Sequence, residues 1–135
     1  MVVDDYARWR SFVASTLRTF TELQIIAEAG DGPEALLKSQ ELRPDLILLD
    51  IGLPTLNGIE VARQVRNGSF TPKILFVSET SSVEIVEGAL KVGHGFVIKS
   101  EAAHDLVPAV KAVLEGKRFV SSRLAGSHPT GGSRR

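Results

Sequence analysis

Five polar residues with the chemistry of a metal and phosphoryl site follow short apolar runs in this 135-residue chain. They are the carboxylates Asp4, Asp5 and Asp50, the hydroxyl of Ser78 and the ammonium of Lys99. Three carboxylates that lie close together repel one another unless a cation neutralises them or some are protonated. Mg²⁺ prefers oxygen ligands and is usually held by few carboxylates, several waters and a phosphate. These residue types therefore predict a divalent cation beside a phosphoryl group.

An aspartate in this setting can also act as a nucleophile and become an acyl phosphate. Ser78 and Lys99 would then contact the phosphoryl oxygens, which is the positioning and charge stabilisation that phosphoryl transfer requires. The ordinary alternative is structural, because an Asp-Asp pair after a strand is often a turn signal or a helix cap. A single serine or lysine at the end of a strand indicates nothing. We favour the site because all five residues follow successive apolar runs.

The apolar runs have the length of strands and alternate with segments of helical period, which is typical of βα units around a parallel sheet. Strands are expected at residues 2–3, 23–29, 45–50, 73–77 and 95–98. Helices are expected at residues 9–20, from 31 onward, and at 59–66, 82–92 and 102–115. The carboxyl ends of parallel strands meet at one edge of the sheet, where ligands bind. The first strand is shorter than the usual ~5–6 residues, so we expect a weakened fold or a loosened acidic pair.

Composition limits the class of protein. The chain is 43% hydrophobic and 24% charged, which is normal for one globular domain. Sixteen basic and sixteen acidic residues give a net charge of zero, so no general attraction to nucleic acid or membrane follows. The absence of cysteine excludes disulfides and thiolate metal sites, and a cytoplasmic location is the natural expectation. No secretory signal and no apolar run of ~20 residues is present, so no membrane association is expected.

The last residues differ in composition from the rest. Residues 126–135 are rich in glycine and serine and contain no large apolar side chain. Such segments cannot bury enough apolar surface to become ordered. We therefore expect a folded domain at residues 1–120 and a flexible linker or tail at 121–135.

Together these motifs resemble the receiver domain of two-component response regulators, over about residues 1–120. Asp4-Asp5 matches the family's acidic pair, and Asp50 matches its phosphoacceptor. Ser78 matches the hydroxyl position, Lys99 the invariant lysine and Phe96 the aromatic switch position. The loop from residue 48 to 58, LLDIGLPTLNG, matches the segment that surrounds the phosphoacceptor. The resemblance implies a flavodoxin-like, doubly wound α/β fold with a five-stranded parallel sheet of order 2-1-3-4-5 and five helices.

The resemblance also implies a reaction. Asp50 would accept a phosphoryl group from a histidine kinase or a phosphotransfer protein. Asp5, Asp50 and the backbone carbonyl of Gly52 would bind Mg²⁺ directly, and Asp4 would act mainly through water. Lys99 would pair with the phosphoryl group. Apart from this self-catalysed phosphotransfer and the later hydrolysis, no enzymatic activity is expected.

A conformational switch is the implied consequence of phosphorylation. Ser78 would move toward the phosphorylated aspartate, and Phe96 would change rotamer in step, which would alter the face formed by the fourth helix, fifth strand and fifth helix. Such a switch is a population shift between two states. The ordinary alternative for Phe96 is a core aromatic residue. Likewise, Trp9 is expected to be a core residue rather than a binding residue, and His94, His104 and His128 to be surface residues.

Two further segments resemble receivers that precede a helix-turn-helix DNA-binding domain: Ser100, directly after the lysine, and the sequence GKRFVS at residues 116–121. This implies control of transcription through a domain absent from this chain, possible homodimerisation through the first and fifth or fourth and fifth helices, and no DNA binding by this chain alone. The alternatives are a stand-alone receiver that acts by protein–protein contact, an interaction module that accepts no phosphate, and an aspartyl-phosphate phosphohydrolase. Phosphohydrolases usually carry a second aspartate two residues after the nucleophile, where this chain has Gly52.

Overall fold

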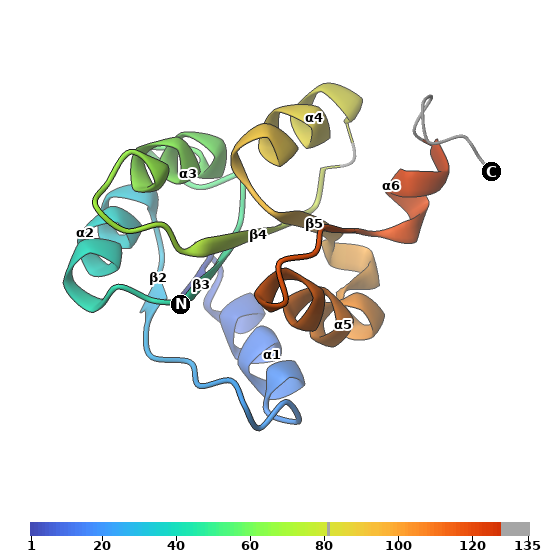
Figure 1. The fold of residues 1–135 in the computed structure, drawn as a ribbon, viewed down its shortest axis with the longest axis horizontal. Coiled ribbons are helices and arrows are strands. Elements are labelled where there is room, and N and C mark those ends of the chain that lie inside the picture. Colours follow the sequence, from blue (N-terminus) through green and yellow to red (C-terminus); the bar gives the residue numbers. More distant parts are fainter. Residues whose placement is uncertain (81, 128–135) are drawn as a thin grey trace.

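A parallel sheet lies between two layers of helices (Figure 1) in the computed structural model, which describes residues 1–80 and 82–127. The strands are β1 (Val2–Val3), β2 (Glu28–Ala29), β3 (Leu46–Leu49), β4 (Lys73–Ser78), β5 (Gly95–Ile98) and β6 (Phe119–Val120). The helices are α1 (Ala7–Leu17), α2 (Gly32–Leu42), α3 (Gly58–Arg66), α4 (Val83–Val92), α5 (Ala102–Leu114), α6 (Ser122–Ser127) and the 3₁₀ turn η1 (Lys99–Glu101). Helices α1 and α5 cover one face, and α2, α3 and α4 cover the other. Within the described residues, no helix is long and apolar enough to cross a bilayer.

The sheet order is β2-β1-β3-β4-β5-β6, so the predicted order of the first five strands is confirmed. The sixth strand was not predicted. It pairs in parallel with β5, with Gly95 opposite Phe119 and Phe96 opposite Val120. A strand of two residues has no alternation to recognise in the sequence, and its position depends on β5 rather than on its own pattern.

The central strands form two apolar cores, one on each face of the sheet. All four residues of β3 are buried, as expected for an unbroken apolar run in the middle of a parallel sheet. Ile47 and Leu49 pack under α2, α3 and α4, whereas Leu46 and Leu48 pack with the side chains of α1 and α5. Burial on both sides fixes the ends of β3 and β4, and these ends carry functional candidates.

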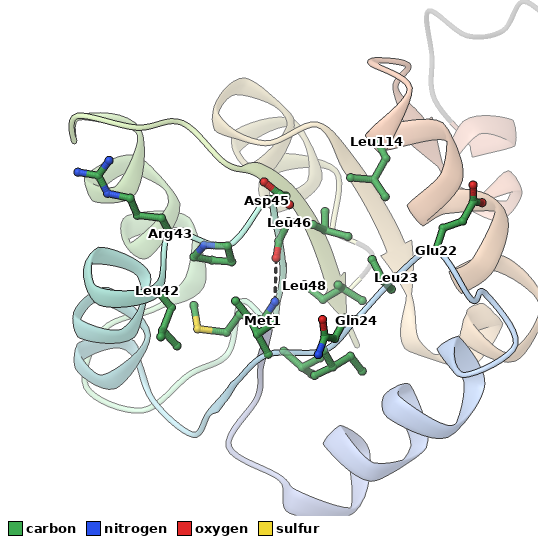
Figure 2. Close-up of a pocket in the computed structure, with 14 residues that line it drawn as sticks. Met1, Glu22, Leu23, Gln24, Leu42, Arg43, Asp45, Leu46, Leu48 and Leu114 are labelled. Atoms are coloured by element: carbon green, nitrogen blue, oxygen red, sulfur yellow. Dashed lines mark hydrogen bonds between the residues drawn. The ribbon is translucent and has the colours of Figure 1, made fainter.

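The second strand is shorter than predicted, because β2 covers residues 28–29 and not 23–29. Strand β1 offers it only two residues as partners, and the ladder starts where the amide of Val2 donates to the carbonyl of Ala27 at 3.1 Å. Residues 23–26 instead line a groove at the opposite end of the sheet from the strand-end carboxylates. Figure 2 shows the terminal amine of Met1 inside this groove, where it donates to the carbonyl of Leu46 at 2.8 Å.

Burial lowers the pKa of the Met1 amine to about 6, against the smaller opposing effect of the Asp45 carboxylate. An unfolded chain binds this proton below about pH 8, so between pH 6 and 8 it holds more protons than the folded chain. For a chain with a free Met1 amine, we expect the free energy of unfolding to rise by about 1–3 kcal/mol from pH 6 to pH 8. Urea unfolding at both pH values measures it. An Nα-acetylated chain should lack this increment, and an equal increment in both chains would contradict the assignment.

The segment after residue 120 is part of the folded core, which corrects the predicted start of the tail at 121. Ser121 and Leu124 are buried, and Ser122–Ser127 is helical. The Ser121 hydroxyl accepts a hydrogen bond from the amide of Ile98 at 3.0 Å and donates one to Asp105 Oδ2 at 2.8 Å. A buried polar network of this kind has no signature in local composition. A flexible tail beyond residue 127 stays a prediction, since residues 128–135 lie outside the described part.

Replacing Ser121 by alanine leaves the Ile98 amide and the Asp105 carboxylate without their shared partner inside the core. Unsatisfied buried polar groups of this kind cost about 1–3 kcal/mol. We expect Ser121→Ala to lower the free energy of unfolding by that amount in urea titrations. The neighbouring Ser122→Ala, at an exposed position, is the matched control and should change stability by less than about 0.5 kcal/mol. Equal effects of the two substitutions would contradict the role of this network.

Candidate functional site

The five strand-end residues lie together at one edge of the sheet. Asp4 and Asp5 follow β1, Asp50 follows β3, Ser78 ends β4, and Lys99 follows β5. All five line the same cleft. The cleft is completed by Ile85 of α4 and by residues of the loops after these strands: Tyr6, Ile51, Gly52, Glu79 and Thr80. The cleft therefore brings together the five strand-end residues and Gly52, whereas Phe96, the switch candidate, is not among its lining residues.

The three carboxylates form a compact cluster. One oxygen from each of Asp4, Asp5 and Asp50 can be chosen so that all three lie within 4.8 Å of one another. Asp4 and Asp50 are buried, and Asp5 is exposed. Asp4 Oδ1 accepts a hydrogen bond from the amide of Tyr6 at 2.9 Å. Its second oxygen, Oδ2, is buried and pairs with the ammonium of Lys99 at 2.7 Å. Three carboxylates that can each turn one oxygen toward the same point fit a hard divalent cation such as Mg²⁺.

Lys99 supplies the positive charge in the cluster. Its Nζ lies 2.7 Å from Asp4 Oδ2 and 3.8 Å from Asp50 Oδ1, and only 13% of its side chain is exposed. The turn η1 begins at Lys99, so the end of β5 directs this side chain. One ammonium against three carboxylates leaves the cluster short of positive charge. A metal ion would correct this deficit.

The pKa of Asp50 is raised to about 6, chiefly because the carboxyl is buried. Repulsion from Asp4 and Asp5 acts in the same direction, and attraction to Lys99 opposes both. Ionisation of Asp50 near neutral pH is therefore costly without a cation. The same environment favours any process that brings a divalent cation to the cluster.

The loop after Asp50 returns to within close contact of the Asp50 backbone. A Cβ on Gly58 would lie 2.1 Å from the Asp50 carbonyl oxygen, so only glycine allows this approach. The Gly58 amide also donates to the Ile51 carbonyl at 2.8 Å, which closes the loop. Asn57 then caps α3 by accepting from the Glu60 amide at 3.0 Å. The turn-forming residues of the sequence thus hold Asp50 and Gly52 at the mouth of the cleft.

Ser78 and Phe96 occupy neighbouring strands behind the carboxylates. Ser78 is buried, and its hydroxyl accepts from the Thr80 amide at 3.4 Å. Phe96 is fully buried, with its ring centroid 6.4 Å from that of Phe76. The structure thus shows Phe96 packed in the core, which agrees with the alternative that it is an ordinary core aromatic residue. Its role as a switch stays a prediction.

Two contacts at the site were missed by the sequence analysis. Trp9 was expected only in the core, and it packs there, but Lys99 Nζ also lies 4.9 Å from its ring centroid. Arg10 donates to the Asp4 carbonyl at 2.7 Å and to Glu28 Oε1 at 2.8 Å. Both residues belong to α1, directly after the acidic pair. That proximity was the only available signal, because an arginine on a helix usually faces solvent.

The three histidines lie away from the carboxylate cluster or outside the described residues. His94 is partly buried, and its Nδ1 accepts from the Ile74 amide at 3.0 Å, so it is more than a surface residue. Burial also lowers the pKa of His94. The side chain of His104 is exposed, as predicted, and lies beside Asp105. His128 lies outside the described residues.

Residues 1–111 match the family model described as the response regulator receiver domain. The chain belongs to this family. The matching region contains β1 to β5 and all five strand-end residues of the cleft. The resemblance seen in the motifs is thereby confirmed, together with the fold that it implied.

Curated relatives of this receiver include whole response regulators. The chain is 29% identical to response regulator GacA of Pseudomonas viridiflava over 126 residues, which is 93% of this chain and 59% of that protein. It is 30% identical to the nitrate/nitrite response regulator protein NarL of Escherichia coli, over 92% of this chain and 58% of that protein. The chain therefore spans less than two thirds of the length of these relatives.

Solved structures with similar folds include receivers. A LuxR-family two-component response regulator from an Aurantimonas species has a TM-score of 0.79 and 31% identity, over 93% of this chain and 90% of that one. The signal receiver domain of a NarL response regulator from Mycobacterium tuberculosis has a TM-score of 0.81 and 32% identity, over 86% of this chain and 94% of that one. Membership of the family therefore assigns this chain the function of a phosphorelay receiver, related to these regulators.

Because the folded state raises the pKa of Asp50 to about 6, it holds this proton in a range where the unfolded chain has lost it. Stability from this group is complete below about pH 4 and is lost as the pH rises to about 6. An asparagine in place of Asp50 would resemble the protonated carboxyl. Without Mg²⁺, we expect Asp50→Asn to raise the free energy of unfolding at pH 7 by about 1–3 kcal/mol. Urea titrations at pH 4 and pH 7 measure the difference.

At pH 4 the gain should disappear, and adding Mg²⁺ at pH 7 should reduce it, because the cation stabilises only the wild-type carboxylate. Asp31→Glu keeps the negative charge of the α2 cap, which is not among the residues that line the cleft; it serves as a control and should show no such dependence on Mg²⁺. A variant of Asp50 that is less stable than the wild type at pH 7 would refute the electrostatic account.

Proposed function

We propose that Asp50 accepts a phosphoryl group from a phosphohistidine on a histidine kinase or phosphotransfer protein. The observation that carries this proposal is the placement of Asp50 between two acidic neighbours and the ammonium of Lys99, in an open cleft at the strand ends. Membership of the receiver family supports it. The partner's identity follows from the chemistry of the family and is part of the proposal.

In the proposed reaction an Asp50 carboxylate oxygen attacks phosphorus, the bond from phosphorus to the donor imidazole nitrogen breaks, and an acyl phosphate forms. The electron pair leaves with the imidazole, which takes a proton from solvent. Mg²⁺, held by Asp5, Asp50 and the Gly52 carbonyl with Asp4 acting through water, would supply neutralisation of the phosphoryl charge. Lys99 would pair with a phosphoryl oxygen, and Ser78 would donate its hydroxyl to another. Water later hydrolyses the acyl phosphate and regenerates the carboxylate.

The output is a population shift. Ser78 moving toward the phosphoryl group would free space beside Phe96, whose buried ring sits on the adjacent strand. A new rotamer of this ring would then alter the face made by α4, β5 and α5. Such a face could contact a partner or a second copy of the chain.

We further propose that the regulated output is transcription, carried by a domain outside this chain, and that the protein works in the cytoplasm. The chain covers 58% of the length of its NarL relative, and a related structure is described as a LuxR-family regulator. A phosphohydrolase is less well supported, because Gly52 stands where those enzymes usually carry a second aspartate.

Beryllofluoride tests the proposal because it imitates a phosphoryl group on a carboxylate. With Mg²⁺ present, we expect it to shift the amide NMR signals of Ser78, Phe96 and their neighbours. Asp50→Asn should abolish the shifts, and Asp31→Glu should preserve them. A wild-type protein that shows no shift, or an Asp50 variant that shows the same shifts, would refute the proposal. Repeated turnover of small phosphate esters would indicate the phosphohydrolase instead.

A further inference from the structure

An aromatic ring borders the ammonium of Lys99. The indole of Trp9, from α1, has its centroid 4.9 Å from Lys99 Nζ. The ammonium also contacts Asp4 at 2.7 Å and faces Asp50 at 3.8 Å. Two carboxylates and one indole therefore surround a charge whose side chain is only 13% exposed.

The interaction between the ring and the cation is electrostatic. The face of an indole carries partial negative charge and attracts an ammonium within about 6 Å of its centroid, more strongly where water is excluded. A lysine side chain is otherwise flexible and its ammonium is strongly hydrated, so it readily extends toward water. In an open cleft, a ring beside the ammonium works against that extension.

The ring itself is held in place from two other directions. Trp9 packs against the apolar core between α1 and α5, which includes Val13 and Leu106. Its ring also contacts that of Phe12, with centroids 5.0 Å apart and the planes tilted by 33°. Trp9 is thus a fixed surface and not an adaptable contact.

We infer that Trp9 is a positioning residue, which holds the ammonium of Lys99 at the carboxylate cluster, where a phosphoryl group on Asp50 would meet it. The part that concerns the phosphoryl group rests on the proposed function. The part that concerns the free protein rests only on the contact between ring and ammonium. No helix-packing role alone requires a cation against this ring.

Three variants separate positioning from packing. Trp9→Leu keeps an apolar side chain but has no aromatic face, Trp9→Phe restores a smaller face, and Phe12→Leu removes the neighbouring ring, for which no contact with Lys99 is found among the described residues. Two quantities are measured: the NMR shift of the Lys99 protons next to the ammonium without Mg²⁺, and the affinity for beryllofluoride at saturating Mg²⁺. The affinity for Mg²⁺ alone is the internal control.

We expect the indole ring current to displace the Lys99 signals in the wild type, and Trp9→Leu to abolish that displacement. Trp9→Leu should weaken beryllofluoride binding about three- to tenfold, the range of a partly desolvated cation–π contact, and change Mg²⁺ affinity by less than about twofold. Trp9→Phe should recover most of the affinity. Phe12→Leu leaves the core contacts of Trp9 in place and should therefore lose clearly less affinity than Trp9→Leu.

Undisplaced Lys99 signals in the wild type would overturn the inference, as would equal losses of beryllofluoride affinity in Trp9→Leu and Phe12→Leu. If the wild type binds no beryllofluoride at all, the proposed function fails, and the displaced Lys99 signals alone then decide whether Trp9 holds the ammonium. The two failures are therefore distinguishable.

Discussion

Burial of a carboxylate among like charges is the constraint on which this structure depends. Asp50 lies at the end of a strand that is buried on both faces, next to Asp4 and Asp5, with only Lys99 to oppose them among the described residues of the cleft. Its pKa of about 6 expresses the cost of that arrangement. The fold thus keeps the pKa of Asp50 close to neutral pH, and a cation stabilises the charged form of this carboxyl. The cluster therefore responds to metal binding and to phosphoryl chemistry. A fully exposed aspartate would not respond in this way.

Asp4, the first residue of the acidic pair, is held by several hydrogen bonds in spite of the short strand before it. Strand β1 has neighbours on both sides: the amide of Asp4 donates to the carbonyl of Ala29, and the amide of Asp50 donates to the carbonyl of Val3. Arg10 and the amide of Tyr6 add further bonds to Asp4. At the opposite end of the sheet, the Met1 amine is buried in a groove (Figure 2). The expected loosening of the acidic pair stays a prediction.

Local sequence patterns were sufficient to predict individual strands and the starts of helices. Unbroken apolar runs predicted β3 and β4. A helix was expected from residue 31 onward, and Asp31 caps α2 by accepting from the Glu34 amide at 2.8 Å. Strand ends then placed the site, because parallel strands share one edge. Most of the unpredicted features depend on residues far apart in the chain. Pairing of β6 with β5, burial of Ser121 and the approach of Lys99 to Trp9 leave no period or motif, since each arises only when distant elements pack.

Ser121, which follows β6, is hydrogen-bonded to β5, the strand that contains the switch candidate Phe96. The amide of Ser121 donates to the carbonyl of Phe96 at 3.0 Å, and its hydroxyl accepts from the amide of Ile98, one residue before Lys99. Asp105 on α5 accepts a hydrogen bond from the Ser121 hydroxyl and completes the link. A displacement of the end of β5 must therefore either carry Ser121 with it or break buried hydrogen bonds, each of which is costly to leave unmade. Ser121 thus links the end of β5, next to Lys99, to α5 and to the start of α6.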